Sequence, residues 1–304
     1  MTLRFGLNLP AGPVTGSPGK FMEDLDVALP QLVGHFDSLW MTDHFIWDRN
    51  PCYEAWTVIC YFAARWPQFK IGPMVLGQSY RNPALLAKMA ATLQHLSGGR
   101  FIMGIGAGWK EDEYRAYDWP YPRAGIRIEQ LQDTLEIMTR MWGEPGPLSW
   151  QGRHYRIVEA ICEPRPDPVP PIIVGGAGRK TMRLAAQYAD GWNLSDSPIE
   201  RFRERHAILQ QHCEELGRDP ASIELSWFGR LSIAESERAA IARSHGRWQR
   251  DRAFVGTAPQ CIEMMQPFVE EGVSCFMLDI MDFADEDVLG AVIEEVLPAL
   301  RPTS

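Results

Sequence analysis

Reactive side chains in this sequence come directly after apolar, strand-like segments. In the stretch LWMTDHFIW, residues 39–47, the pair Asp43 and His44 follows such a segment. An imidazole changes its charge near neutral pH, so a histidine at this place can take up or release a proton during a reaction. The pair also has a purely structural interpretation, in which Asp43 caps a turn and His44 bonds a carbonyl group.

The stretch VGGAGRKT, residues 174–181, is typical of an anion-binding turn. Its small residues separate an apolar run from an amphipathic helix, whose first N–H groups and positive dipole end attract a phosphate. It is not a P-loop, because that motif places a glycine directly before its lysine, where this sequence has an arginine. An ordinary glycine-rich turn is the alternative to a cofactor-phosphate site made of Gly175, Gly176, Ala177, Gly178 and Arg179.

The stretch GIGAGW, residues 104–109, superficially resembles a dinucleotide-binding fingerprint. Its spacing is G-x-G-x-G, it follows a fourth strand, and no acidic residue ends a following strand about 20 residues on, so that interpretation fails. Small residues such as Gly106, Ala107 and Gly108 let a flat ring approach the backbone, or they serve strand packing. Glu113, a little further along this loop, is a second candidate for proton transfer.

Two further groups complete the candidate site. Gly77, Gln78 and Ser79 follow the third strand and offer hydrogen bonds to the amide edge of a ring, although a plain turn before a helix explains them equally well. The aromatic residues either line an apolar substrate pocket or fill the core. These two interpretations apply to Trp40, Trp47, Trp56 and Trp109, of which Trp47, Trp56 and Trp109 are the predicted pocket residues.

Eight strand-like runs alternate with eight amphipathic, helix-like stretches. The predicted strands are Leu3–Leu9, Phe36–Met41, Lys70–Leu76, Arg100–Gly106, Pro171–Gly175, Gly191–Leu194, Ile223–Phe228 and Ser274–Ile280. The predicted helices cover about 19–33, 53–66, 82–96, 110–142, 178–189, 198–216, 257–271 and 284–299.

This alternation predicts an α/β protein with a parallel sheet, and eight units are the number that closes a (β/α)8 TIM barrel. An open, doubly wound sheet is disfavoured because the first strand runs into NLPAGPVTGSPG, a long segment with proline. We predict one domain over 1–304, with insertions at about 143–170 and 234–254. The first contains a short hairpin; the second is either a surface insertion, which is the preferred interpretation, or a mobile lid.

The barrel explains why the candidate residues belong together. Active sites of such barrels lie at the carboxyl ends of the strands, where the next loop begins. Asp43 and His44, the third-strand turn, the fourth loop and the glycine-rich fifth loop all occupy that position in the sequence. We therefore expect them at one mouth of the barrel.

Composition excludes several classes of partner and ligand. The 304 residues are 45% hydrophobic and carry 30 Lys and Arg against 39 Asp and Glu, a net charge of -9, so nucleic acid is not an expected partner. No membrane span or secretory signal is recognisable, and we expect a cytoplasmic protein without membrane contact. The six cysteines lack C-x-x-C spacing and no H-x-H or HExxH pattern occurs, which predicts reduced thiols and no metal site.

Taken together, these stretches resemble the luciferase-like monooxygenase superfamily, and specifically its branch that uses the deazaflavin coenzyme F420. The resemblance covers nearly the whole chain. It is carried by TDHF at 42–45, YRNPALLAKMAATLQHLSGGRF at 80–101, GIGAGWKEDEY at 104–114, GRHYRI at 152–157, PPIIVGGAGRKTMRLAAQYADGWN at 170–193 and GRDP at 217–220.

The resemblance implies a luciferase-like barrel that holds a flavin-like ring in its mouth and the cofactor phosphate at residues 176–179. It also implies a non-proline cis peptide in a bulge of the third strand, which supports the back of the ring. In this sequence we expect that bulge around Leu76, Gly77 and Gln78.

By the same resemblance, His44 corresponds to the active-site histidine of sugar-phosphate and alcohol dehydrogenases of the F420 branch. Asp43 corresponds to its neighbour at the ring. Those dehydrogenases often have a tryptophan four residues after the histidine, whereas Trp47 comes three residues after His44.

We therefore expect an oxidoreductase that moves a hydride between coenzyme F420 and a small organic substrate. A deazaflavin has carbon at its hydride position and reacts poorly with oxygen, so the protein must only orient it and manage a proton. The alternatives are an FMN-dependent monooxygenase that uses reduced flavin and oxygen, and a non-catalytic flavin-binding protein. Expected partners are the substrate, a reductase that supplies reduced F420 or flavin, and a second copy in a homodimer.

Overall fold

The computed structural model describes residues 3–12, 18–47, 50–245, 248 and 252–301 of the chain. Its main sheet contains ten strands, all in parallel pairs: β1 Arg4–Leu9, β2 Ser38–Met41, β3 Lys70–Pro73, β4 Leu76–Gly77, β5 Met103–Gly106, β8 Ile172–Gly175, β9 Gly191–Ser195, β10 Glu224–Ile233, β11 Ala253–Gly256 and β12 Cys275–Ile280. A separate antiparallel hairpin consists of β6 Leu148–Gln151 and β7 Arg156–Ala160.

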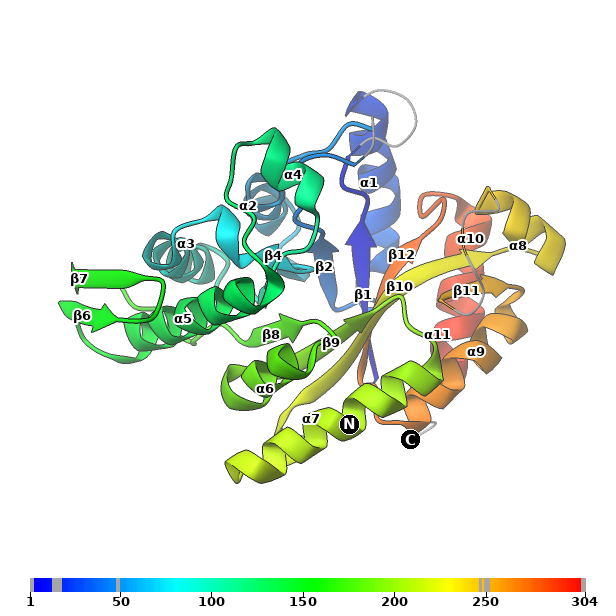
Figure 1. Cartoon of the computed structure of the whole chain (residues 1–304). Helices are drawn as coiled ribbons and strands as arrows, with labels where there is room; N and C mark the ends of the chain where they lie inside the picture. The colour runs from blue at the N-terminus through cyan, green and yellow to red at the C-terminus, as the bar shows by residue number, and fades with distance from the viewer. Residues whose placement is uncertain (1–2, 13–17, 48–49, 246–247, 249–251, 302–304) are drawn as a thin grey trace.

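Helices connect the strands and surround the sheet (Figure 1). They are α1 Pro18–Leu32, α2 Ala55–Arg65, α3 Pro83–Leu96, α4 Glu111–Ala116, α5 Ala124–Gly143, α6 Arg179–Tyr188, α7 Ile199–Leu216, α8 Glu237–Arg243, α9 Ala258–Glu270, α10 Glu286–Gly290 and α11 Leu297–Leu300, with a π-helical turn at Ala291–Val296 and 3-10 turns at Gln78–Tyr80 and Pro220–Ser222. Among the helices of the described ranges, none is long and apolar enough to cross a membrane.

The sheet closes into a barrel. Its strands are ordered β3-β2-β1-β12-β10-β9-β8-β5-β4, and β3 and β4 are two parts of one interrupted strand. The ring closes where the Ile71 N–H donates to Arg100 O (3.0 Å) and the Ile102 N–H donates to Ile71 O (2.9 Å). The predicted (β/α)8 architecture is therefore confirmed, and every predicted strand overlaps an observed one.

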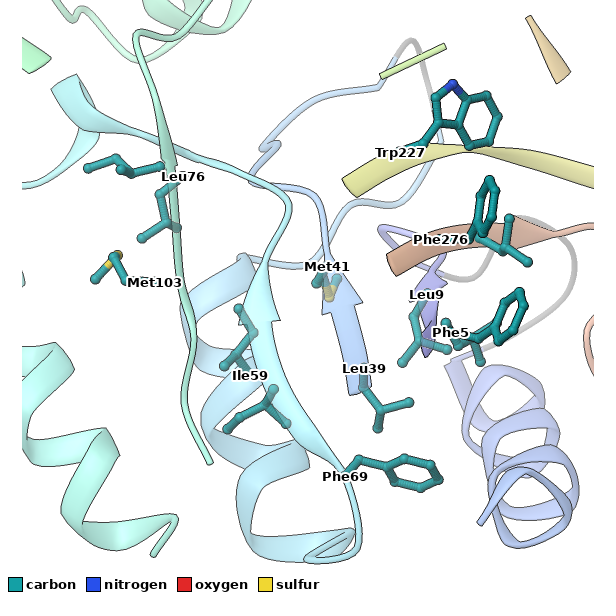
Figure 2. Close-up of a cluster of buried hydrophobic side chains, with 14 of the residues drawn as sticks. Phe5, Leu9, Leu39, Met41, Ile59, Phe69, Leu76, Met103, Trp227 and Phe276 are labelled. Carbon is teal, nitrogen blue, oxygen red and sulfur yellow. The ribbon is translucent and has the colours of Figure 1, made fainter. Parts of the chain in front are cut away.

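Alternation along the strands separates two apolar layers. Phe5 and Leu9 of β1 point away from the barrel axis and pack with Phe276 in the layer beneath the helices, as Figure 2 shows. A smaller cluster fills the barrel interior, where Trp40 and Met277 are buried together with Ile102. Side chains at the mouth therefore rest on a solid interior rather than on a channel.

Two segments differ from their predicted form. The helix predicted over 110–142 is split into α4 and α5 by a loop that contains Pro120 and Pro122, because proline lacks the N–H that a helix interior requires. The segment 234–254, predicted to be irregular, contains α8 and the first residues of β11. That helix is too short to produce a recognisable period in the sequence. The predicted hairpin within 143–170 is confirmed as β6 and β7.

The expected bulge lies earlier than predicted. The non-proline cis peptide joins Met74 to Val75, and the bonds from Val75 to Ser79 are trans, so its predicted position around residues 76–78 is wrong. Backbone pairing explains the place of the interruption. The Met74 N–H still bonds Met41 O beside β2, and Leu76 already pairs with β5. Val75 is the residue between these two ladders.

Candidate active site

His44 and Glu113 meet at the mouth of the barrel. The Nδ1 atom of His44, which follows β2, lies 3.2 Å from both carboxylate oxygens of Glu113 on α4. The Glu113 carboxylate, fully buried, also accepts hydrogen bonds from the N–H groups of Phe45 (2.7 Å) and Ile46 (3.0 Å) and from the Tyr80 hydroxyl (3.2 Å). Four donors therefore converge on one carboxylate.

These bonds determine the protonation state of the pair. Burial alone raises the pKa of Glu113, but the hydrogen bonds from His44, Ile46 and Phe45 outweigh burial and lower that pKa below its usual value. An ionised carboxylate only accepts hydrogen bonds, so Nδ1 of His44 must carry a proton and Nε2 of the neutral imidazole is left as the base. The geometry suits Glu113 to orienting His44, a different role from the proton donor that the sequence suggested.

Two tryptophans border the histidine. The ring centroid of His44 lies 4.8 Å from that of Trp47 and 5.7 Å from that of Trp109. The Lys110 ammonium group lies 5.6 Å from the Trp47 ring, a cation–π distance. Trp47 is 37% exposed and Trp109 is 64% exposed, so both rings present apolar surface to an incoming molecule. The structure places Trp56 elsewhere, on α2 and buried in the core.

The position of Trp56 follows from its helix. It is the second residue of α2, and its ring packs edge-on against Phe101 with centroids 5.5 Å apart. The guanidinium carbon of Arg81 lies 6.0 Å from the centroid of the Trp56 ring. The side chain therefore makes no ring contact with His44, and its predicted place in the substrate pocket is not supported.

Asp43 holds the backbone at the mouth. Its buried carboxylate accepts hydrogen bonds from the Gly77 N–H (3.0 Å) and from the guanidinium of Arg81 (3.0 and 3.1 Å). Burial raises the pKa of Asp43, while the charge of Arg81 acts in the opposite direction. Because these bonds tie the end of β2 to β4, Asp43 positions the loop, and its carboxylate is engaged rather than directed at a ring.

Gln78 and Ser79 also face the protein. Gln78 is fully buried, and its Nε2 donates to Ser79 Oγ (2.6 Å) and to Gln130 Oε1 (3.3 Å), while its Oε1 accepts from the Tyr155 hydroxyl (3.3 Å). Ser79 Oγ accepts a further hydrogen bond from Tyr114 (3.2 Å). These bonds fasten the third-strand turn to α5 and the hairpin, so the predicted contact of the Gln78 amide with a ring is not supported.

Glycines make room for the bulge. A Cβ atom on Gly106 would lie 3.0 Å from a methyl carbon of Val75, and one on Gly175 would lie 2.9 Å from it. Val75 is only partly buried, so it forms a small apolar floor at the mouth between β5 and β8. The packing interpretation of Gly106 is therefore supported. Gly108 adopts a φ of 75°, and a Cβ there would lie 2.1 Å from the Tyr114 hydroxyl, so the turn next to the half-buried Ala107 requires glycine.

The loop after β8 has the features of an anion site. Gly176 has a φ of 139° and donates its N–H to Asn193 O (3.1 Å), and Gly178 is the N-cap of α6. The first helical bond runs from Met182 to Gly178 O, which leaves the preceding helix N–H groups outside the helical pattern. The Arg179 guanidinium instead donates to Gln211 Oε1 (3.2 Å), which turns it along α7.

The requirement for small side chains in this loop can be tested by substitution. Gly178→Val should weaken binding of a phosphate-bearing cofactor by tenfold or more, about 1.4 kcal/mol, because the added side chain occupies the approach to the α6 N-terminus. Folding should be retained, since a Cβ at Gly178 finds only Thr181 Oγ1, at 3.5 Å. Fluorescence titration measures the affinity. Gly290→Val, at a glycine that also has open space, is the matched control. An unchanged affinity in the folded Gly178→Val variant would show that the phosphate does not bind at this loop.

Several mouth residues escaped sequence reasoning. Tyr80 and Arg81 were not among the predicted site residues, because their contacts with Glu113 and Asp43 join loops far apart in the sequence. Asn8 and Asp279 are polar residues near the carboxyl ends of apolar strands, at positions that face the barrel interior. The sequence signal that could have identified both residues was a polar residue at a strand position that faces the barrel interior.

The remaining chemistry of the described residues is limited. They contain no group of three or more His, Cys, Asp or Glu side chains arranged to hold a metal ion. None of the six cysteines, which all lie in the described residues, forms a disulfide, and four of them are buried. Cys52 lies beside the site, where its Sγ is 3.1 Å from His44 O, and burial raises the pKa of its thiol to about 11. That thiol is therefore protonated and unreactive near neutral pH.

The chain is similar to a known family and to several known proteins. Residues 34–273 match the luciferase-like monooxygenase family. The chain is 28% identical over 302 residues to the F420-dependent glucose-6-phosphate dehydrogenase of Amycolatopsis mediterranei, which covers 87% of this chain and 90% of that protein. It is 28% identical over 230 residues to the phthiodiolone/phenolphthiodiolone dimycocerosates ketoreductase of Mycobacterium tuberculosis, over 73% of this chain and 59% of that protein.

A similar solved structure is that of an F420-dependent secondary alcohol dehydrogenase in complex with an F420-acetone adduct. The TM-score is 0.85 at 21% identity, with 99% of this chain and 100% of that chain covered. Fold and site together define a (β/α)8 barrel with an imidazole at its mouth. The chain belongs to the luciferase-like monooxygenase family, which confirms the resemblance seen in the sequence.

Proposed function

We propose that the protein is an F420-dependent oxidoreductase that moves a hydride between the deazaflavin coenzyme and a small organic substrate. The observation that carries this proposal is the His44–Glu113 pair, placed between two exposed tryptophans at the barrel mouth. The relatives named above support it, because they comprise an F420-dependent dehydrogenase and a ketoreductase.

The mouth fits a flat coenzyme with a phosphate. Gly176 and Gly178 lie at the α6 N-terminus with no side chains of their own, and Val75 presents a small apolar surface between β5 and β8. Gly176 and Gly178 would hold the phosphate, and Val75 would lie against the ring. When bound, coenzyme F420 supplies the carbon centre that accepts or returns a hydride and has little reactivity with oxygen.

The residues of the chain manage the proton. When a carbinol is oxidised to a carbonyl, the carbon loses a hydride and the hydroxyl group loses a proton. Nε2 of His44 takes that proton, since Nδ1 is engaged by the ionised Glu113. Trp47 and Trp109 cover the apolar part of a bound substrate and exclude water from it. Reduction of a carbonyl uses the same groups in the reverse direction.

The cofactor can be tested directly. Titration of the apoprotein should show binding of coenzyme F420 at least tenfold tighter than binding of FMN, as measured by fluorescence. Turnover of secondary alcohols or ketones with the F420 complex is expected to follow. Tighter binding of FMN together with oxygen consumption would favour the monooxygenase alternative, and binding without turnover of any alcohol or ketone would favour the non-catalytic alternative.

The partners of this enzyme follow from the same proposal. An F420 reductase or dehydrogenase would supply the coenzyme in the required redox state. A homodimer and a cytoplasmic location stay predictions, and so does the organisation of residues 1–304 as one domain. Sedimentation analysis of the full chain measures whether it forms a homodimer.

A further inference from the structure

A polar layer lies at the mouth ends of β1, β12 and β10. The last registered pair of β1 and β12 is Leu7 with Leu278, so the next residues, Asn8 and Asp279, are neighbours, and Asp279 pairs in turn with Arg230 of β10. Residues in register on parallel strands point to the same side. Because Met277, two residues before Asp279, lies in the barrel interior, the three polar side chains face the interior above it.

Asn8 is an unsatisfied member of this layer. It is only 3% exposed, and its Nδ2 donates to Leu9 O (3.3 Å), but its Oδ1 has no hydrogen-bond partner among the described residues. Buried polar atoms in folded proteins are normally hydrogen-bonded, because leaving one unpaired has a free-energy cost. A bound donor group would remove this cost.

Asp279 is the second open acceptor. Burial raises the pKa of Asp279 to about 6; the charge of Arg230 lowers it and the charge of Asp196 raises it. The Arg230 guanidinium is already engaged, because it donates to Asp196 Oδ1 at 3.0 Å and lies 6.0 Å from the Trp248 ring. Arg252 also acts on Asp196. No hydrogen bond reaches the Asp279 carboxylate from the part of the chain that the structure describes.

We propose that Asn8 and Asp279 form a subsite that accepts hydrogen bonds from hydroxyl groups of a neutral substrate, so that the enzyme acts on an uncharged hydroxylated alcohol or ketone rather than on a phosphate ester. This inference rests on the proposed function. β1 is the direct neighbour of β2, whose end carries His44, so the subsite adjoins the reacting centre. A carboxylate without a cation bonded to it repels a phosphate monoester and favours a hydroxyl donor.

The test compares each neutral polyol with its own phosphate. Glycerol and glucose are assayed beside glycerol 1-phosphate and glucose 6-phosphate, with the F420-loaded wild type, with Asp279→Asn and with Asn8→Leu. We expect kcat/KM at least tenfold higher for the neutral member of each pair. Asp279→Asn and Asn8→Leu should each lower that value about tenfold or more, chiefly through KM, while the affinity for coenzyme F420 is unchanged.

Stability measurements make the outcome independent of turnover. The raised pKa of Asp279 means that its ionised form opposes folding at neutral pH, so Asp279→Asn should keep or raise the Tm of the free protein. A neutral polyol should raise the Tm of the wild type by mass action but not that of Asp279→Asn. Asp287→Asn, at an exposed aspartate on α10, is the matched control and should behave like the wild type.

Each contrary result has its own meaning. A preference for the phosphate member, or polyol protection that survives in both variants, would overturn the subsite. Loss of F420 affinity in Asp279→Asn would assign the layer to the coenzyme and overturn its role in substrate selection. A wild type that does not bind F420 would instead refute the proposed function, and the Tm comparison would still decide the subsite.

Discussion

Replacement of His44 by Ala or Asn is expected to lower turnover by about 10²–10⁴-fold, the usual contribution of a positioned acid or base. The affinity for coenzyme F420 should change little, because the proposed phosphate site at the α6 N-terminus and the Val75 surface belong to other strands. Steady-state rates with a secondary alcohol measure the first quantity, and fluorescence titration measures the second.

A histidine outside the mouth provides the control. His35 precedes β2, at the opposite end of that strand, and His35→Ala should retain the rate and the pH profile of the wild type. Near-full turnover in His44→Ala would show that the proton is exchanged elsewhere. A cofactor-bound structure with the imidazole turned away from the ring would lead to the same conclusion.

Glu113→Gln should produce the second large effect. An amide has one acceptor oxygen and an NH2 group, so it cannot accept all four donors that converge on this carboxylate. We expect turnover to fall by about 10–10³-fold, since loss of a carboxylate behind a catalytic histidine leaves the imidazole in the wrong tautomer or orientation. The loss should appear in kcat more than in KM. Glu113→Asp, which keeps the charge, should recover part of it.

The same carboxylate makes stability depend on pH. Because the folded pKa of Glu113 lies below its usual value, its stabilising contribution is complete above the ordinary glutamate range and is lost as pH falls through the lowered pKa. The Tm difference between wild type and Glu113→Gln should therefore be largest near neutral pH and should shrink in acid. Glu111→Gln, at an exposed position on the same helix, should show no such difference. Equal kcat and an unchanged pH profile in Glu113→Gln would rule out the positioning role.

The two mouth residues differ in how far the sequence alone could identify them. His44 was recognisable because it directly follows an apolar strand, and strand ends form the active face of a barrel. Glu113 was recognisable as a candidate, but its role as an acceptor was not. That role depends on the N–H groups of residues 45 and 46, which lie 68 and 67 positions away along the chain.

The sequence by itself determined the eight-stranded alternation, the glycine-rich loop before α6 and the histidine after β2. These features are local, since strand and helix periods and turn chemistry are expressed within about ten residues. Only the tertiary structure decided which way Gln78 points, where the third strand breaks, and that Asn8 and Asp279 stand side by side. Those outcomes depend on the register between strands far apart in the chain, and register is set by the packing of the whole barrel rather than by any single segment.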